Sequence, residues 1–273
     1  MFLKKIGVGA VTGLLASAGV AAAAPQPWQI DLQPAASPVM QDIQDFHTLL
    51  VYIITAISLF VAGLLIWVMI RYNARSNPVP SKVVHNTLIE IIWTVVPVII
   101  LVLIAIPSFR LLYFEADIPN PDLTIKAIGK QWFWSYEYPA SNFQFDSLGL
   151  SDADAAKANE PRLLGVDNVI VVPVNKVVKV QTTGADVIHS WAIPAFGVKM
   201  DAVPGRINET WFKATKEGVY YGECSELCGA RHAYMPIEVK VVSQSAYEAW
   251  LAGAKKKFAS IDAPATRVAA LTK

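Results

Sequence analysis

Two long apolar segments dominate the first half of the chain. Leu49 to Ile70 contains no charged residue, and a second apolar run lies between Glu90 and Arg110. A helix needs about 20 predominantly apolar residues to cross a bilayer. The pattern therefore predicts two membrane spans, at about residues 47–70 and 89–110, and their short connection predicts an antiparallel helical hairpin.

The charges around these spans predict their orientation. The connecting segment carries Arg71, Arg75 and Lys82 and no acidic residue. Basic residues concentrate in cytoplasmic loops, so we expect this loop in the cytoplasm and both chain ends on the exported side. Trp67 and Trp93 lie near the span ends that face the loop, as interfacial anchors do.

The first 24 residues have the pattern of a secretory signal peptide. Lys4 and Lys5 precede an apolar stretch from Ile6 to Val20, and four alanines, Ala21 to Ala24, follow as a small-residue cleavage site. We expect a signal peptide over residues 1–24, with Pro25 leaving the cut position open. The alternative is a third, uncleaved membrane helix.

From Phe114 onward the pattern changes to short β-rich runs separated by proline, glycine and aspartate. Many short strands at this spacing predict a β-sandwich or barrel. We expect residues 25–113 to hold the amino-terminal segment and hairpin, 114–242 the β-domain, and 243–273 a short amphipathic helix and a loose tail. The expected strands are residues 123–128, 131–138, 169–174, 176–183, 207–214, 218–223 and 237–242.

Composition supports a membrane anchor joined to a folded domain. Hydrophobic residues make up 54% of the chain and charged residues only 16%, which is too apolar for an ordinary soluble domain. The net charge of +1 and the lack of a basic patch with interleaved aromatics give no indication of nucleic acid binding. Residues 115–242 hold 12 Lys and Arg against 16 Asp and Glu, a net charge of −4 that would attract a basic partner.

Chemistry concentrates in one short segment. Cys224 and Cys228, the only cysteines, are followed by His232 and Met235, and His189 after a strand-like run could complete a ligand set. Thiolates, imidazole and thioether are soft ligands that select copper over magnesium, calcium or manganese.

Three other interpretations compete with copper. Two cysteines in an exported chain usually form a disulfide. Two Cys and two His could hold a structural zinc ion, and Met235 could be an ordinary core side chain. The combination favours copper, because a zinc site would not require Met235 as a ligand and a disulfide would not require His232 and Met235.

The run Cys-Ser-Glu-Leu-Cys-Gly-x-x-His-x-x-Met resembles the binuclear copper A loop of the cytochrome c oxidase subunit II family. The resemblance extends from about Gln41 through the β-domain, and it implies a cupredoxin-like Greek-key β-sandwich on a two-helix transmembrane hairpin. It also implies that two copper ions are bound. The implied ligands are the bridging thiolates of Cys224 and Cys228, one histidine for each copper (His189 and His232), Met235 and the backbone carbonyl of Glu226.

The same resemblance implies roles for residues outside that loop. Trp132 matches the tryptophan that accepts electrons from cytochrome c, and Glu90 matches a glutamate at the mouth of a proton pathway. The carboxylate of Glu226 matches one that binds magnesium or manganese at the seam with subunit I. Acidic residues that match positions on or near the docking face are Glu137, Asp186 and Asp201, with Asp146 nearby.

Two of these residues also have simpler interpretations. From the residues alone, a solvated carboxylate at the cytoplasmic interface is the favoured interpretation of Glu90, although an ionisable group at the edge of a span suggests function; the family resemblance shifts the balance toward function. Trp132, Trp134, Tyr136 and Tyr138 alternate along one expected strand, so most of these rings should pack on the core.

We therefore expect a membrane-anchored all-β protein that serves as the electron-accepting subunit of a cytochrome c oxidase. Oxygen reduction and proton translocation would involve subunit I, and the expected partners are subunits I and III, cytochrome c and the lipid bilayer. The expected location is a bacterial plasma membrane or the equivalent mitochondrial inner membrane, with the copper domain on the periplasmic side. A membrane-tethered copper-binding or disulfide-stabilised β-domain without electron transfer remains the alternative.

Overall fold

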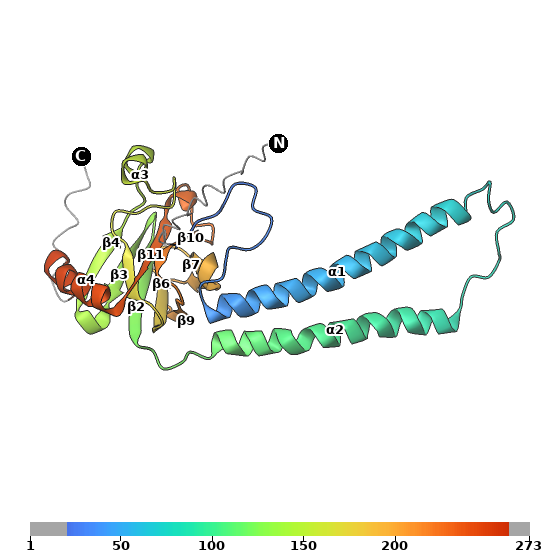
Figure 1. The fold of residues 1–273 in the computed structure, drawn as a ribbon, viewed down its shortest axis with the longest axis horizontal. Coiled ribbons are helices and arrows are strands. Elements are labelled where there is room, and N and C mark those ends of the chain that lie inside the picture. The colour runs from blue at the N-terminus through green and yellow to red at the C-terminus, as the bar shows by residue number, and fades with distance from the viewer. Residues whose placement is uncertain (1–20, 262–273) are drawn as a thin grey trace, which may run out of the picture.

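The computed structural model describes residues 21–261 and consists of a long helical hairpin attached to a β-domain (Figure 1). Most of the predicted signal peptide lies outside these residues. Its last part, Ala21–Ala23, forms a short strand, β1, that pairs in parallel with Gly218–Tyr220 of β10 (Gly218–Cys224). The cleavage of a signal peptide remains a prediction.

The two helices of the hairpin are α1 (Pro38–Arg71) and α2 (Thr87–Ala116), and both are apolar and long enough to cross a membrane. Ser37 begins α1 because its hydroxyl accepts the Met40 N–H, and Pro38 fits the first helical turn. The helices are longer than the predicted spans. Polar caps, Ser37 for α1 and Asn86 for α2, determine where the helices begin, rather than the limits of the apolar runs.

The β-domain is a sandwich of two mixed sheets, which confirms the predicted fold class. One sheet has the order β5-β11-β10-β7-β8 with β1 beside β10, and the other has the order β4-β3-β2-β6-β9. The strands are β2 (Leu123–Lys130), β3 (Phe133–Tyr138), β4 (Phe143–Ser147), β5 (Ile170–Pro173), β6 (Val177–Gly184), β7 (His189–Ile193), β8 (Val198–Ala202), β9 (Asn208–Lys213), β10 and β11 (Pro236–Val242).

The predicted aromatic face of β3 is largely confirmed. Trp134, Tyr136 and Tyr138 are buried between the sheets, where the Tyr138 ring stacks on that of Phe143. Trp132 lies just before the strand and is only partly buried. The helix α4 (Gln244–Lys257) lies where the carboxy-terminal helix was predicted. Its Trp250 packs on the core beside the ring of Tyr138.

Besides β1, three strands and one α-helix of the described residues were not predicted from the sequence. β7 is buried at all five residues and therefore shows no alternation, and β8 carries Lys199 and Asp201 within a five-residue strand. β4 is also only five residues long. The helix α3 (Asp152–Ala158) is a seven-residue element whose amino end is capped by Ser151.

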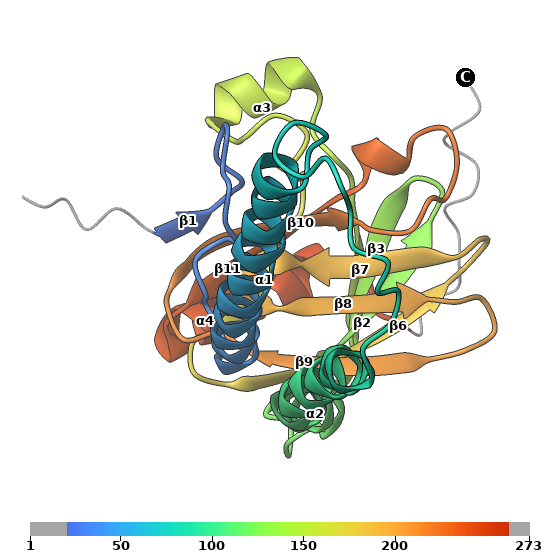
Figure 2. The same cartoon turned by 90° about the vertical axis from the view of Figure 1, so that its right-hand side faces the viewer.

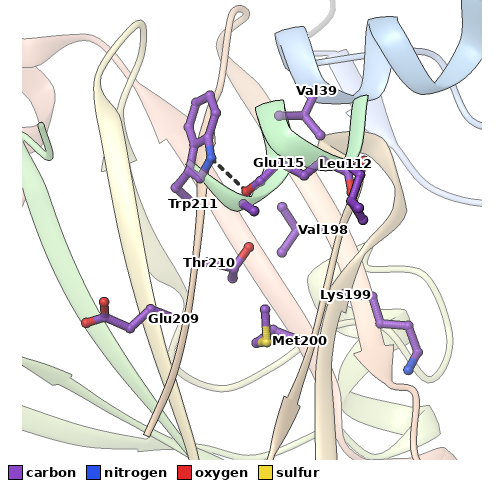
Figure 3. A pocket seen from close by; sticks show the side chains of 11 residues that line it. Val39, Leu112, Glu115, Val198, Lys199, Met200, Glu209, Thr210 and Trp211 are labelled. Carbon is purple, nitrogen blue, oxygen red and sulfur yellow. Dashed lines mark hydrogen bonds between the residues drawn. The ribbon is translucent and has the colours of Figure 1, made fainter. Parts of the chain in front are cut away.

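The hairpin joins the β-domain through a few specific contacts. The Trp211 indole N–H of β9 donates to the Glu115 carbonyl at 3.2 Å, and its ring meets Phe114 edge-on at 5.6 Å. A cleft of about 320 Å³ lies beside this contact, where α2 approaches β8 and β9 (Figure 3). Seen along the helices, α2 lies beside β9, and α3 lies on the opposite side of the domain (Figure 2).

Residues 148–169, between β4 and β5, form an excursion that covers the outer face of β11. Glu238 points to that face, since its neighbours Ile237 and Val239 enter the core, yet it is only 4% exposed. Its carboxylate accepts the Val166 N–H at 3.1 Å. Burial raises the pKa of Glu238 to about 7, and the nearby Glu160 carboxylate adds to the rise.

This buried carboxyl predicts a pH-dependent stability. The pKa of Glu238 in the folded state lies above the unfolded value of 4.5, so ionisation of this carboxyl lowers the free energy of unfolding. This loss of stability is absent below pH 4.5 and complete above pH 7. Glu238→Gln keeps an acceptor for Val166 and removes the charge. We expect it to stabilise the subunit by about 2 kcal/mol more at pH 8 than at pH 5, as measured by chemical unfolding in detergent. Glu217→Gln, in an exposed turn, is the control, and an equal effect of Glu238→Gln at both pH values would contradict the prediction.

Candidate metal centre

His189 reaches the candidate site from the first residue of β7 and is fully buried. Its Nε2 lies 2.8 Å from Asp186 Oδ1, which is consistent with Nε2–H donating to the carboxylate and leaves Nδ1 free to bind a metal. The ring packs against Gly129 of β2, where an added Cβ would lie 2.6 Å from the imidazole. The absence of a side chain at residue 129 therefore makes room for this ligand.

The other candidate ligands come from the end of β10 and from residues 225–235, which we call the ligand loop. Cys224 is the last residue of β10, and its N–H donates to the Met235 carbonyl, which brings the two ends of the loop together. Ser225 N–H donates to the Ser190 carbonyl, so the loop is also fixed beside β7. Gly229 has a φ of +124°, a conformation that favours glycine.

The six predicted ligands lie around one centre. Cys224 Sγ is 3.9 Å from His189 Nδ1, 3.4 Å from the Glu226 carbonyl oxygen and 3.9 Å from Cys228 Sγ. Cys228 Sγ is in turn 3.5 Å from both His232 Nδ1 and Met235 Sδ. Residues up to 46 positions apart thus present side-chain nitrogen and sulfur and one backbone carbonyl oxygen to the same small volume.

The pKa values of the two thiols are shifted in opposite directions. Burial of Cys224 opposes ionisation, but the His189 ring and backbone groups of Glu226 and Ser190 outweigh it and lower its pKa to about 7. Burial and the negative charge of Cys224 raise the pKa of Cys228 to about 12. A bound cation would favour the thiolate form of both residues.

The donor set fits copper. Both cysteines are free, and their sulfurs are well beyond the 2.05 Å of a disulfide bond. His189, Cys224 and Cys228 have ligand atoms within 4.8 Å of one another, which is close enough for a single metal site. The thioether of buried Met235 adds a soft donor that suits copper better than zinc.

Trp132 lies directly beside the ligand loop. An added Cβ at Gly229 would contact the Trp132 ring at 3.1 Å, and the indole N–H is buried with no hydrogen-bond partner among the described residues. Gln131 ties this tryptophan to the site, because its backbone N–H donates to Asp186 at 2.7 Å and its side-chain amide donates to the Cys228 carbonyl at 2.8 Å.

The remaining predicted residues lie elsewhere or have other partners. Glu90 is in the first turn of α2, and its carboxylate accepts the Asn86 N–H. This end of α2 lies far from the β-domain (Figure 1). The Glu226 side chain is exposed beside the ligands. All four predicted docking acids have a partner within the chain: Glu137 with Lys126, Asp146 with Ser135 and Lys130, Asp186 with His189, and Asp201 with Lys199.

Sequence reasoning assigned Asp186 only to partner docking and did not single out Gln131. The structure shows that both hold the site together. The Asp-x-x-His spacing could have indicated the Asp186 contact, because a ligating histidine commonly donates its second N–H to a carboxylate. No sequence signal indicated the contact of Gln131 with Cys228.

Comparison with known proteins decides the family. The profile of the cytochrome c oxidase subunit II periplasmic domain matches residues 123–242, and that of its transmembrane domain matches residues 25–111. The chain belongs to the cytochrome c oxidase subunit II family. It is therefore a membrane-bound subunit of the haem–copper oxidases, which are oxidoreductase complexes.

Individual members of the family are similar over most of the chain. A probable cytochrome c oxidase subunit 2 of Rickettsia felis is 54% identical over 92% of this chain and 80% of its own. The subunit 2 of Cereibacter sphaeroides is 44% identical over 89% of this chain and 88% of its own. A crystal structure of the periplasmic domain of subunit II of Bradyrhizobium japonicum is 61% identical, covers 52% of this chain and 100% of that chain, and has a TM-score of 0.49.

The Asp186 contact generates a prediction about metal affinity. Asp186→Asn should remove the charge that orients His189 and lower copper affinity by about tenfold to a hundredfold. Affinity would be measured by chelator competition with the full-length subunit in detergent. Asp201→Asn is the matched control, because this acid pairs with Lys199 and contacts no ligand; equal affinities of the two variants would show that Asp186 does not position the ligand.

Proposed function

We propose that this chain accepts electrons from cytochrome c at a binuclear copper A centre and passes them to haem in subunit I. The observation that carries the proposal is the convergence of His189, Cys224, Cys228, His232 and Met235 with the Glu226 carbonyl. Copper supplies one-electron chemistry when bound. The chain supplies the ligands, a buried site and a fixed geometry.

The arrangement of the ligands supports two coppers better than one. His189 Nδ1 lies 3.9 Å from Cys224 Sγ, and His232 Nδ1 lies 3.5 Å from Cys228 Sγ and also interacts with Cys224. Two coppers would be held by Cys224 and Cys228 together with His189 and His232, and the Glu226 carbonyl and Met235 would complete the donor set. The β-sheet framework and the buried His189 hold these donors in place, which favours rapid electron transfer because little has to move.

Trp132 is the proposed point at which electrons enter the subunit. The indole is partly exposed, contacts Gly229 of the ligand loop and is linked through Gln131 to the Cys228 carbonyl. It therefore lies between solvent and the ligands. Acidic residues of the β-domain would attract a basic cytochrome c; the proposed docking acids are Glu137, Asp146, Asp186 and Asp201.

The remaining roles concern the partner subunits and the membrane. We assign Glu90 to the mouth of a proton pathway and the exposed Glu226 carboxylate to a magnesium or manganese ion shared with subunit I, because a hard cation prefers oxygen ligands. The β-domain would lie on the periplasmic side of a bacterial plasma membrane. Subunits I and III would contact the two helices, whose apolar side chains are exposed along most of their length.

Replacing the indole tests the proposed route. Trp132→Leu should lower the rate of electron input from reduced cytochrome c roughly tenfold or more, as expected when an aromatic contact at the centre of an interface is lost. The copper content should not change. The measurement is stopped-flow haem reduction in the assembled oxidase, with metal analysis of the same sample.

Phe133→Leu is the control for Trp132→Leu. Phe133 is the adjacent aromatic residue, and its ring lies under the Lys130 ammonium instead of beside Gly229. If both variants accept electrons at the rate of the unmodified oxidase, Trp132 serves packing only and the proposed route is wrong.

A further inference from the structure

A second cavity lies beside the ligand loop, and Trp132 is not among the residues that line it. It has a volume of about 370 Å³, within the range of small-molecule sites. The excursion contributes residues 149–152 and 162–163 to its lining, and the ligand loop contributes Arg231 and Tyr234 next to Pro236. No residue of α1 or α2 lines it.

The walls of this cavity are held by specific contacts. An added Cβ at Gly149 would lie 2.9 Å from the Pro236 ring and 3.2 Å from the Tyr234 carbonyl, so the excursion packs tightly on the ligand loop here. Leu150 N–H donates to the Gly165 carbonyl, and Val166 N–H donates to buried Glu238. The excursion is thus held against the ligand loop at Gly149 and against β11 at Val166.

Two arginines line the cavity, and most of their hydrogen-bonding capacity is unused. Arg162 donates from Nε to Asp152 at 3.0 Å, and its two terminal nitrogens have no partner among residues 21–261. The exposed side chain of Arg231 forms no ion pair or hydrogen bond within the same residues, and its guanidinium lies 5.7 Å from the Tyr234 ring centroid. The charged side chains that line the cavity are Arg162, Arg231 and Asp152, which gives two positive charges and one negative charge.

We propose that this cavity binds a small oxyanion, with a phosphate or carboxylate group held by Arg162 and Arg231. The planar fork of a guanidinium matches the paired oxygens of such groups and binds them with charge-assisted hydrogen bonds. Arg231 directly precedes His232 in the ligand loop. A bound anion would therefore link the excursion to the loop that presents the metal ligands, and it would place negative charge beside them. The site does not require copper to be present.

The test is titration of the copper-free, full-length subunit in detergent with inorganic phosphate, at constant ionic strength set with sodium chloride. Calorimetry should show saturable binding at one site, and acetate in a second arm should compete if the site also takes carboxylates. Arg231→Gln and Arg162→Gln should each weaken phosphate binding by about tenfold or more. Arg231→Lys, which keeps the charge but not the fork, should bind with intermediate affinity.

Arg206→Gln is the matched control, because Arg206 is an exposed arginine on the β8–β9 turn, outside the cavity. Its phosphate affinity should equal that of the unmodified subunit. The proposal is overturned if phosphate has no effect beyond that of chloride, or if the Arg206 and Arg231 variants lose affinity equally. Unchanged thermal unfolding of the variants without phosphate would show that any loss of binding is not a loss of fold.

Discussion

The structure depends on holding two cysteine sulfurs close together without joining them. Cys224 and Cys228 lie 3.9 Å apart in a buried setting where ionisation of the first opposes ionisation of the second. Such an arrangement is costly unless a cation is bound between the sulfurs, because buried like charges repel in a medium of low dielectric. The surrounding histidines, thioether and carbonyl supply further donors for that cation.

The β-sandwich provides the rigidity that this arrangement requires. β7 and β10 pair next to the ligands, with Trp191 opposite Cys224, and Gly222 lets the strands approach so closely that an added Cβ would lie 1.9 Å from the Ala192 carbonyl. Gly129 likewise admits the His189 ring. Metal sites built on such a framework keep their geometry when the charge on the metal changes. The positions of His189 and Cys224 therefore depend on residues that are not themselves candidate ligands.

The sequence predicted the parts of the molecule that depend on local pattern. Two uninterrupted apolar runs indicated the hairpin, and the spacing of Cys224, Cys228, His232 and Met235 indicated a soft metal site. β7 could not be predicted because it is buried on both faces and shows no alternation, and the contacts of Asp186 and Gln131 join segments up to 97 residues apart. Such long-range contacts follow from the strand order, which no local pattern contains.

The most direct test of this account is the copper content and electron paramagnetic resonance spectrum of the full-length subunit, loaded with copper under reducing conditions and then oxidised. The account predicts two coppers per chain and a signal from one unpaired electron shared between two copper nuclei, with neither cysteine in a disulfide. A single copper with an electron confined to one nucleus, or a bond between Cys224 and Cys228 in the copper-loaded protein, would contradict it.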